Sequence, residues 1–90
     1  MLIALIARDK SGHLETRLAN RAAHLDYVTS TGVVRQAGPL LDAEEQMIGS
    51  LLILEVEDME SARQWAAGDP YSKAGLFRDV ELIPWKKVIG

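Results

Sequence analysis

An apolar run close to the start of the chain constrains the fold more than any other segment. Residues 1–7 read MLIALIA, and the charged residues Arg8 and Asp9 follow at once. The run is much shorter than the roughly 20 apolar residues of a membrane-spanning helix, and it is typical of a strand buried on both faces. The strand predicted over residues 51–57 also carries apolar side chains on both sides. We therefore expect a sheet that has to be covered on both of its faces.

The remaining elements complete a single domain over residues 1–90. The predicted order is a strand at 1–7, a helix at 14–31, strands at 33–37 and 51–57, a helix between Asp58 and Gly68, a turn of helix after Asp69 and a strand at 76–83. The order β-α-β-β-α-β is typical of the ferredoxin-like α+β fold, an antiparallel sheet with both helices on one face. Two helices leave the second face uncovered, and an apolar face of that size is rare on a monomer. We therefore expect a homodimer whose sheets pack face to face, a dimeric α+β barrel.

The long helix and the segment after the second strand carry further local signals. A cap at Ser11 and a break near Asn20 are expected, because one unbroken helix would be about 27 Å long. The helix has two neighbouring stripes, an apolar one of Leu14, Leu18, Leu25 and Val28 and a polar one of Arg17, Arg21, His24 and Tyr27. Gly38-Pro39 is expected to end the second strand, followed by a loop with an acidic centre over residues 40–48.

The composition excludes several kinds of site. The net charge is −3 and Lys86-Lys87 is the only adjacent basic pair, which argues against a nucleic-acid partner. The absence of cysteine excludes disulfides, thiolate nucleophiles and zinc–thiolate sites, and the two histidines are not at a metal-ligand spacing. We expect a cytosolic (cytoplasmic) protein without a membrane partner, a metal or another cofactor.

The segment from Gly68 to Gly75 carries the most distinctive local chemistry. Asp69 is suited to cap a short helix that has Pro70 at its first position. Asp69 could also orient a histidine for acid–base catalysis, and His24 on the long helix is the candidate. Asp26 is a second candidate partner, although it points to another side of the helix. The residues alone leave two interpretations open, a simple helix cap and a cap that also serves a His–Asp pair.

Other candidate residues have ordinary explanations. Arg17 and Arg21 could neutralise an anionic ligand, but solvated surface arginines are commoner. His13 is expected in a solvated turn, and Ser50 lacks the sequence pattern of a nucleophile elbow. Trp65 is expected in the core.

Short motifs along essentially the whole chain resemble the YciI-like (YCII-related) domain family. They are Asp9-Lys10, Arg17-Leu18, Arg21 with Ala23-His24-Leu25, Gly38-Pro39, Gly49-Ser50, Trp65-Ala66, Asp69-Pro70-Tyr71, Ala74-Gly75 and Pro84-Trp85-Lys86-Lys87-Val88. Each motif is common by itself, and their order and spacing carry the resemblance. The chain departs from the family at Ala22, where proline is frequent, and in its shorter, acidic loop.

The resemblance implies a ferredoxin-like dimer with a pocket centred on His24 and Asp69. Gly38, Pro39, Ser50 and Tyr71 are expected to line the pocket, and Arg21 is a further candidate for substrate binding. The activity attached to the family is dehydrochlorinase-type lyase chemistry on hydroxylated aromatic rings. Two functions are therefore expected. One is a cofactor-free enzyme that performs acid–base chemistry on a small cyclic or phenolic compound. The other is a binding or accessory protein that holds a small molecule without turnover.

Overall fold

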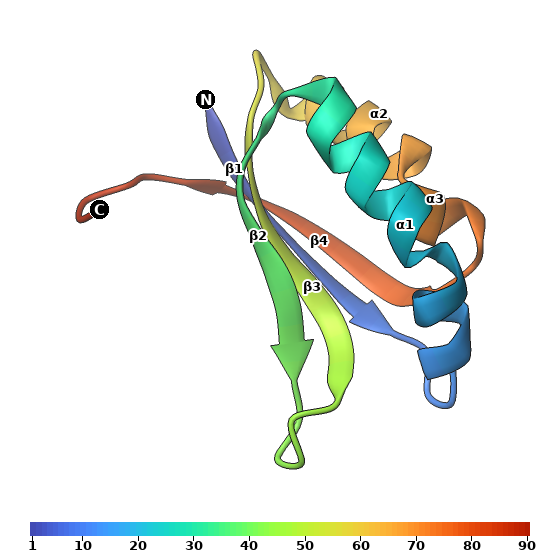
Figure 1. The fold of residues 1–90 in the computed structure, drawn as a ribbon. Coiled ribbons are helices and arrows are strands. Elements are labelled where there is room, and N and C mark those ends of the chain that lie inside the picture. The colour runs from blue at the N-terminus through green and yellow to red at the C-terminus, as the bar shows by residue number, and fades with distance from the viewer.

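The computed structural model describes all residues from Met1 to Gly90 (Figure 1). The elements are β1 (Leu2–Asp9), α1 (Leu14–Thr31), β2 (Val34–Leu41), β3 (Met47–Glu55), α2 (Met59–Gly68), α3 (Pro70–Lys73) and β4 (Phe77–Trp85). The strands form one antiparallel sheet in the order β2-β3-β1-β4. In Figure 1 the helices lie on one side of this sheet, so the predicted ferredoxin-like α+β fold is confirmed. None of the helices combines the length and the apolar character that crossing a membrane requires.

The hydrophobic core lies between the helices and the two central strands. It consists of Ile3, Leu5, Ala7, Leu52, Leu54, Ala62 and Trp65. Leu5 of β1 stands opposite Leu52 of β3 in the register of the sheet, and both side chains are 1 % exposed. Burying a side chain of this kind contributes about 1.5–3 kcal/mol to folding. The alternate residues of the same strands therefore point to the other face of the sheet.

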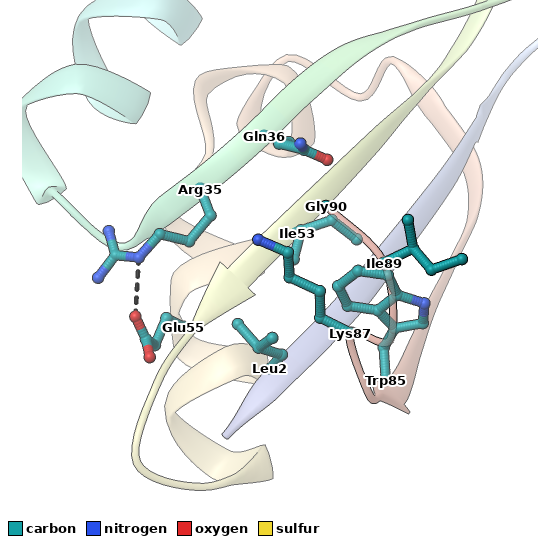
Figure 2. Close-up of a pocket in the computed structure, with 9 residues that line it drawn as sticks. All are labelled: Leu2, Arg35, Gln36, Ile53, Glu55, Trp85, Lys87, Ile89 and Gly90. Carbon is teal, nitrogen blue, oxygen red and sulfur yellow. Dashed lines mark hydrogen bonds and ion pairs between the residues drawn. The ribbon is translucent and has the colours of Figure 1, made fainter.

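That other face is apolar at its centre, as the sequence predicts. Leu51, Ile83 and Trp85 lie on it and are between 40 and 44 % exposed. A hollow of about 420 Å³ lies on this face. Figure 2 shows the residues that line it, which are Leu2, Arg35, Gln36, Ile53, Glu55, Trp85, Lys87, Ile89 and Gly90. At its edge Nε of Arg35 donates a hydrogen bond to Glu55 at 2.8 Å. The chain thus leaves an uncovered sheet face with an apolar centre and a charged edge.

Two predicted strand boundaries are wrong. Gly38-Pro39 was expected to end the second strand, whereas β2 continues to Leu41. β2 is an edge strand, and an edge strand tolerates a proline without an N–H donor. The structure has a turn at 42–46 in place of the loop expected over residues 40–48. In this turn Oδ1 of Asp42 accepts hydrogen bonds from the N–H groups of Glu44 and Gln46 at 2.9 Å each. β3 therefore begins at Met47.

The predicted helix break is also absent. α1 runs without interruption, and the side-chain amide of Asn20 donates to the carbonyl of Thr16 at 2.9 Å. His13 occupies the N-cap position that was predicted for Ser11, and its side chain makes no capping hydrogen bond. In the first turn of the helix, Arg17 is joined to Asp9 of β1 by two hydrogen bonds.

The buried face of α1 differs from the predicted one. Leu14, Leu18 and Leu25 of the apolar stripe face outward, with exposed fractions of 37, 53 and 46 %, whereas Val28 packs against the core. The buried residues of the helix are Arg17 and His24. Polar side chains can be buried when hydrogen bonds within the protein replace those to water. Both Arg17 and His24 make such hydrogen bonds.

Trp65 should dominate the packing of α2 on the sheet, because it is 7 % exposed and belongs to the core. We expect Trp65→Ala to lower the free energy of unfolding by about 3–5 kcal/mol, since it removes a large side chain that cannot be replaced by local collapse. Denaturant unfolding measures this difference. Gln64→Ala, at the exposed neighbouring position, should change it by less than about 0.5 kcal/mol. A loss under about 1 kcal/mol for Trp65→Ala would contradict the assigned packing.

Candidate active site

Asp69 directly precedes α3 and is its N-cap. Oδ1 of Asp69 accepts the backbone N–H of Tyr71 at 2.9 Å, and Pro70 stands in the first turn, where its missing N–H costs nothing. The Asp69 side chain is only 1 % exposed. A buried carboxylate is costly unless donors compensate the lost water. Oδ1 of Asp69 also accepts a hydrogen bond from a second donor within the protein.

The second donor is His24 of α1. Its Nδ1 lies 2.8 Å from Oδ1 of Asp69, although the two residues are 45 positions apart in the sequence. An ionised carboxylate only accepts hydrogen bonds, so Nδ1 carries the proton and Nε2 of the neutral imidazole carries the lone pair. His24 is 6 % exposed. The alternative partner, Asp26, lies on the exposed side of the helix and makes no hydrogen bond to His24.

Tyr71 fixes the plane of the imidazole. The two rings are stacked, with centroids 4.0 Å apart and an angle of 12° between the planes. Phe77 meets the Tyr71 ring edge-on with a centroid distance of 5.9 Å. Burial raises the pKa of the Tyr71 hydroxyl, although the charges of Arg17 and Arg21 act against that rise. The phenol therefore stays neutral at physiological pH, and His24 has an uncharged platform beneath it.

The position of His24 relative to Asp69 depends on how α1 meets α2. The hydroxyl of Tyr27 donates to the carbonyl of Trp65 at 2.7 Å, and Nε1 of Trp65 donates to the hydroxyl of Thr31 at 2.9 Å. Gly68 leaves room for this contact, because a Cβ at that position would lie 2.5 Å from the Tyr27 hydroxyl oxygen. These contacts hold α1 against the end of α2, directly before Asp69.

Arg17 is a second buried polar residue of α1, and it is 3 % exposed. Its Nε and Nη2 donate to the two carboxylate oxygens of Asp9 at 2.7 and 2.9 Å, and Nη2 also donates to Oγ of Ser50 at 2.8 Å. Its Cζ lies 4.7 Å from the centroid of the Tyr71 ring. Burial alone would lower the pKa of Arg17, but the hydrogen bonds and the charge of Asp9 outweigh it and raise the pKa. The guanidinium therefore stays charged.

The interpretation of Arg17 as a solvated arginine is wrong. A usable signal was present in the helical spacing, since residues 17, 21 and 24 recur at intervals of four and three and share one face. The sequence does not reveal the partner Asp9, which stands at the end of β1 and reaches Arg17 only in the folded chain.

A pocket of about 150 Å³ lies where these elements meet. It is lined by Arg17, Arg21, His24, Leu25, Ala37, Gly38, Pro39, Met47, Ser50, Leu52 and Tyr71. The structure therefore brings together every residue that the sequence analysis assigned to the pocket wall, with Asp69 hydrogen-bonded behind His24. The sequence analysis considered Arg17 for an anionic ligand without assigning it to the pocket wall. It missed Leu25, Ala37, Met47 and Leu52, whose positions depend on strand register and helix orientation.

The pocket around His24 is smaller than the hollow on the open sheet face, yet it is the better candidate for a functional site. It holds a buried histidine–aspartate pair and a buried arginine, whereas the ion pair beside the open-face hollow is half exposed. Perturbed and partnered ionisable groups in a cavity are typical of functional sites. No group of three or more His, Asp and Glu residues is arranged to hold a metal ion.

Comparison with known proteins agrees with this geometry. The family described as the YCII-related domain matches residues 1–86. The chain belongs to this family. Protein YciI of Escherichia coli O6:H1 is 38 % identical over an alignment of 97 positions that covers 98 % of this chain and 99 % of the relative. An uncharacterized protein of Haemophilus influenzae is 36 % identical with the same coverage.

Solved structures extend the comparison. The 5-chloro-2-hydroxyhydroquinone dehydrochlorinase TftG of Burkholderia phenoliruptrix, solved in complex with 2,5-dihydroxybenzoquinone, is 35 % identical with a TM-score of 0.89 and covers 96 % of this chain and 94 % of its own. An antibiotic biosynthesis monooxygenase is 12 % identical with a TM-score of 0.61 and covers 99 % of this chain and 100 % of its own. The second likeness concerns the fold alone, whereas the first includes related sequence as well as fold.

The glycine before Ser50 should be required for the close pairing of β3 with β1. A Cβ at Gly49 would collide with the backbone carbonyl of Ala7 on the neighbouring strand, and a backbone atom cannot move aside cheaply. We expect Gly49→Ala to destabilise the protein by about 1–3 kcal/mol, as overpacking does, measured by thermal or denaturant unfolding. Gly38→Ala is the matched control, because a Cβ there meets nothing within 4 Å. Equal stability of the two variants would contradict the close approach of β3 to β1.

Proposed function

We propose that this YCII-family chain is a cofactor-free enzyme of the lyase type that acts on a small hydroxylated ring. The observation that carries the proposal is the hydrogen bond between Nδ1 of His24 and the buried Asp69, which leaves Nε2 of His24 as a base. His24, which carries Nε2, lines the pocket. A positioned imidazole with an orienting carboxylate is the usual arrangement for proton transfer near neutral pH.

In the proposed reaction Nε2 of His24 accepts a proton from a hydroxyl group of the ring. That oxygen forms a carbonyl group, the ring electrons shift to the carbon that bears the leaving group, and this carbon takes up a proton. A second hydroxyl group then loses its proton to solvent as a leaving group such as chloride departs with the electron pair of its own bond. The substrate thus loses two hydroxyl protons and an anion and gains one proton on carbon, which together equal the loss of HX. Asp69 stabilises the imidazolium that forms, because an ionised carboxylate favours the charged form of its partner.

The related dehydrochlorinase TftG supports this reaction class, because its name gives the removal of HCl from a chlorinated hydroxyhydroquinone. The pocket supports a small substrate, since its volume is about 150 Å³. A second function, the binding of a hydroxylated ring without turnover, uses the same contacts. The two functions differ only in whether Nε2 accepts a proton from the bound ring.

The proposal includes a homodimer that covers the open sheet face. Leu51, Ile83 and Trp85 leave apolar surface on that face, beside the hollow drawn in Figure 2. A second copy of the chain carries an identical apolar surface. In a two-fold dimer the two sheet faces cover each other, so neither of them stays exposed. The tail residue Ile89, which is 91 % exposed, adds to the apolar surface at the hollow.

The catalytic proposal is tested with 5-chloro-2-hydroxyhydroquinone as substrate and chloride release as the measurement. We expect His24→Gln to lower kcat at least a hundredfold, because the general base is lost. We expect Asp69→Asn to lower kcat at least tenfold, since asparagine still caps a helix but does not stabilise an imidazolium. His13→Gln and Asp58→Asn are matched controls, the latter at the N-cap of α2, and both should keep the wild-type rate.

Two outcomes would contradict the catalytic role. Chloride release by His24→Gln at the wild-type rate would exclude His24 as the base. Binding of the ring by the wild-type protein without any chloride release, seen as thermal stabilisation alone, would favour the binding function.

The dimer is tested by sedimentation at micromolar concentration. We expect the wild-type protein to sediment at twice the mass of one 9.9 kDa chain. Leu51→Glu places a charge at a position that is 40 % exposed in one chain, so the chain should fold but sediment as a monomer. Leu18→Glu introduces the same charge on the outer side of α1 and should leave the dimer intact. A monomeric wild-type protein would contradict the proposed cover of the sheet.

A further inference from the structure

We infer that Tyr27 is a positioning residue for the His24–Asp69 pair, and that Gly68 leaves the space that its hydroxyl group occupies. Tyr27 is not among the residues that line the pocket, so it acts through the position of Asp69 and not through contact with a substrate. The inference rests on the proposed function, because it concerns the same pair of side chains.

Three hydrogen bonds join one face of α1 to the segment that ends in Asp69. Residues 24, 27 and 31 share this face, because they recur at intervals of three and four. Nδ1 of His24 donates to Asp69 at 2.8 Å. The carbonyl of Trp65 accepts the Tyr27 hydroxyl at 2.7 Å, and its indole N–H donates to Thr31 at 2.9 Å. The His24–Asp69 pair is therefore flanked by a second attachment of α2 to α1 that lies outside the pocket.

The Tyr27 hydroxyl replaces a donor that is missing at the end of α2. In a longer helix the N–H of Asp69 would bind the carbonyl of Trp65, four residues earlier. Here Asp69 has an extended backbone, with φ −62° and ψ 127°, and its N–H donates to the carbonyl of Ala66 at 3.3 Å. Pro70 favours an extended conformation at the residue before it. The carbonyl of Trp65 is thus left to the hydroxyl from α1, which fixes the last turn of α2 directly before Asp69.

Thr31 and the aromatic rings keep the Tyr27 hydroxyl in this orientation. Oγ1 of Thr31 accepts the indole N–H of Trp65 and donates to the backbone carbonyl of Tyr27, at 2.9 Å each. The ring of Tyr27 lies against the indole of Trp65, with centroids 4.9 Å apart and an angle of 41° between the planes. The three side chains therefore support one another, and the hydroxyl is oriented before any substrate binds.

The charge of Asp69 also acts on Tyr27. Burial raises the pKa of the Tyr27 hydroxyl, and the negative charge of Asp69 raises it further. The phenol therefore keeps its proton at physiological pH and remains a hydrogen-bond donor. A neutral phenol places no second negative charge near the buried carboxylate.

Gly68 provides the space for this hydroxyl group. A Cβ at position 68 would lie 2.5 Å from the hydroxyl oxygen of Tyr27 and 3.2 Å from its Cζ. The first distance is too short for a carbon and an oxygen atom, so Gly68→Ala should push the hydroxyl away from the Trp65 carbonyl. Tyr27→Phe removes the same oxygen. The two substitutions therefore act on one interaction, and their effects should not add.

The test follows the ring nitrogens of the two histidines by heteronuclear NMR of the full chain, labelled at histidine, at neutral pH. In the wild-type protein His24 should carry its proton on Nδ1. Tyr27→Phe keeps the aromatic ring against Trp65 and removes only the hydroxyl. We expect exchange of the Nδ1 proton of His24 with solvent to become roughly ten- to a hundredfold faster, because the Trp65 carbonyl loses its donor and the end of α2 opens more often.

His13 is an internal control in the same spectrum. Its Nδ1 lies 2.9 Å from the carbonyl of Ser11, at the opposite end of α1 from Tyr27, so its ring signals should not change in Tyr27→Phe. Thr29→Val is the matched control variant, because it removes an exposed hydroxyl from the same part of the helix. Equal exchange rates of the His24 proton in the wild-type protein and in Tyr27→Phe would overturn the inference.

A double-mutant cycle separates positioning from general stability. Gly68→Ala by itself should accelerate exchange of the His24 proton about as much as Tyr27→Phe does. In the Tyr27→Phe background Gly68→Ala should add less than about twofold. Alanine favours a helix more than glycine does, so Gly68→Ala need not lower the free energy of unfolding. Fully additive effects on the exchange rate would show that the two residues act independently, and would overturn the inference.

The NMR measurement requires no substrate, so it separates the inference from the proposed function. With 5-chloro-2-hydroxyhydroquinone, Tyr27→Phe should lower kcat roughly tenfold and change KM by less than about twofold, because Tyr27 does not line the pocket. Faster exchange in Tyr27→Phe without chloride release by the wild-type protein would support the positioning role and remove the lyase function. Chloride release that depends on His24, with unchanged exchange in Tyr27→Phe, would support the lyase function and remove the positioning role.

Discussion

One carboxylate oxygen connects the fold of this chain with its candidate chemistry. Oδ1 of Asp69 accepts the backbone N–H that begins α3 and the Nδ1–H of His24 from α1, at 2.9 and 2.8 Å. The same atom therefore starts the short helix, joins two helices and sets the tautomer of the imidazole. Two donors on a single oxygen also offset the cost of burying the charge. The carboxylate that caps α3, between α2 and β4, is thus the same group that orients His24 in the pocket.

The inner face of α1 also makes hydrogen bonds to other elements of the fold. Arg17 reaches Asp9 on β1, and Tyr27 reaches the carbonyl of Trp65 on α2. Buried ion pairs contribute little net stability compared with apolar packing, because desolvation cancels much of their attraction. Their effect here is positional. They turn the polar side of α1 toward the sheet, and this places His24 and Arg17 on the same cavity while the leucines of the helix face outward.

The sequence predicted some local features correctly. Asp69 caps α3, as predicted, because an N-cap depends on residues within one turn of the chain. The cap predicted for Ser11 is absent, and His13 occupies that position. Trp65 lies in the core as expected. The end of the second strand was mispredicted, because Gly38-Pro39 breaks an interior strand but is compatible with an edge strand. The sequence does not state which strand becomes the edge. The sequence also did not reveal that Asp9 pairs with Arg17, because the two residues come together only in the folded chain.

The sequence by itself determined the order of the elements, the short capped helix at Asp69 and a sheet with two apolar faces, because these follow from periodicity and from contacts between near neighbours. The tertiary structure decided which face of α1 is buried, where β2 ends and which residues line the pocket. These features depend on groups that are far apart in the chain, such as Asp9 with Arg17 and Asp69 with His24. A polar residue is buried or exposed according to whether such a partner reaches it, and only the folded chain brings the partners together.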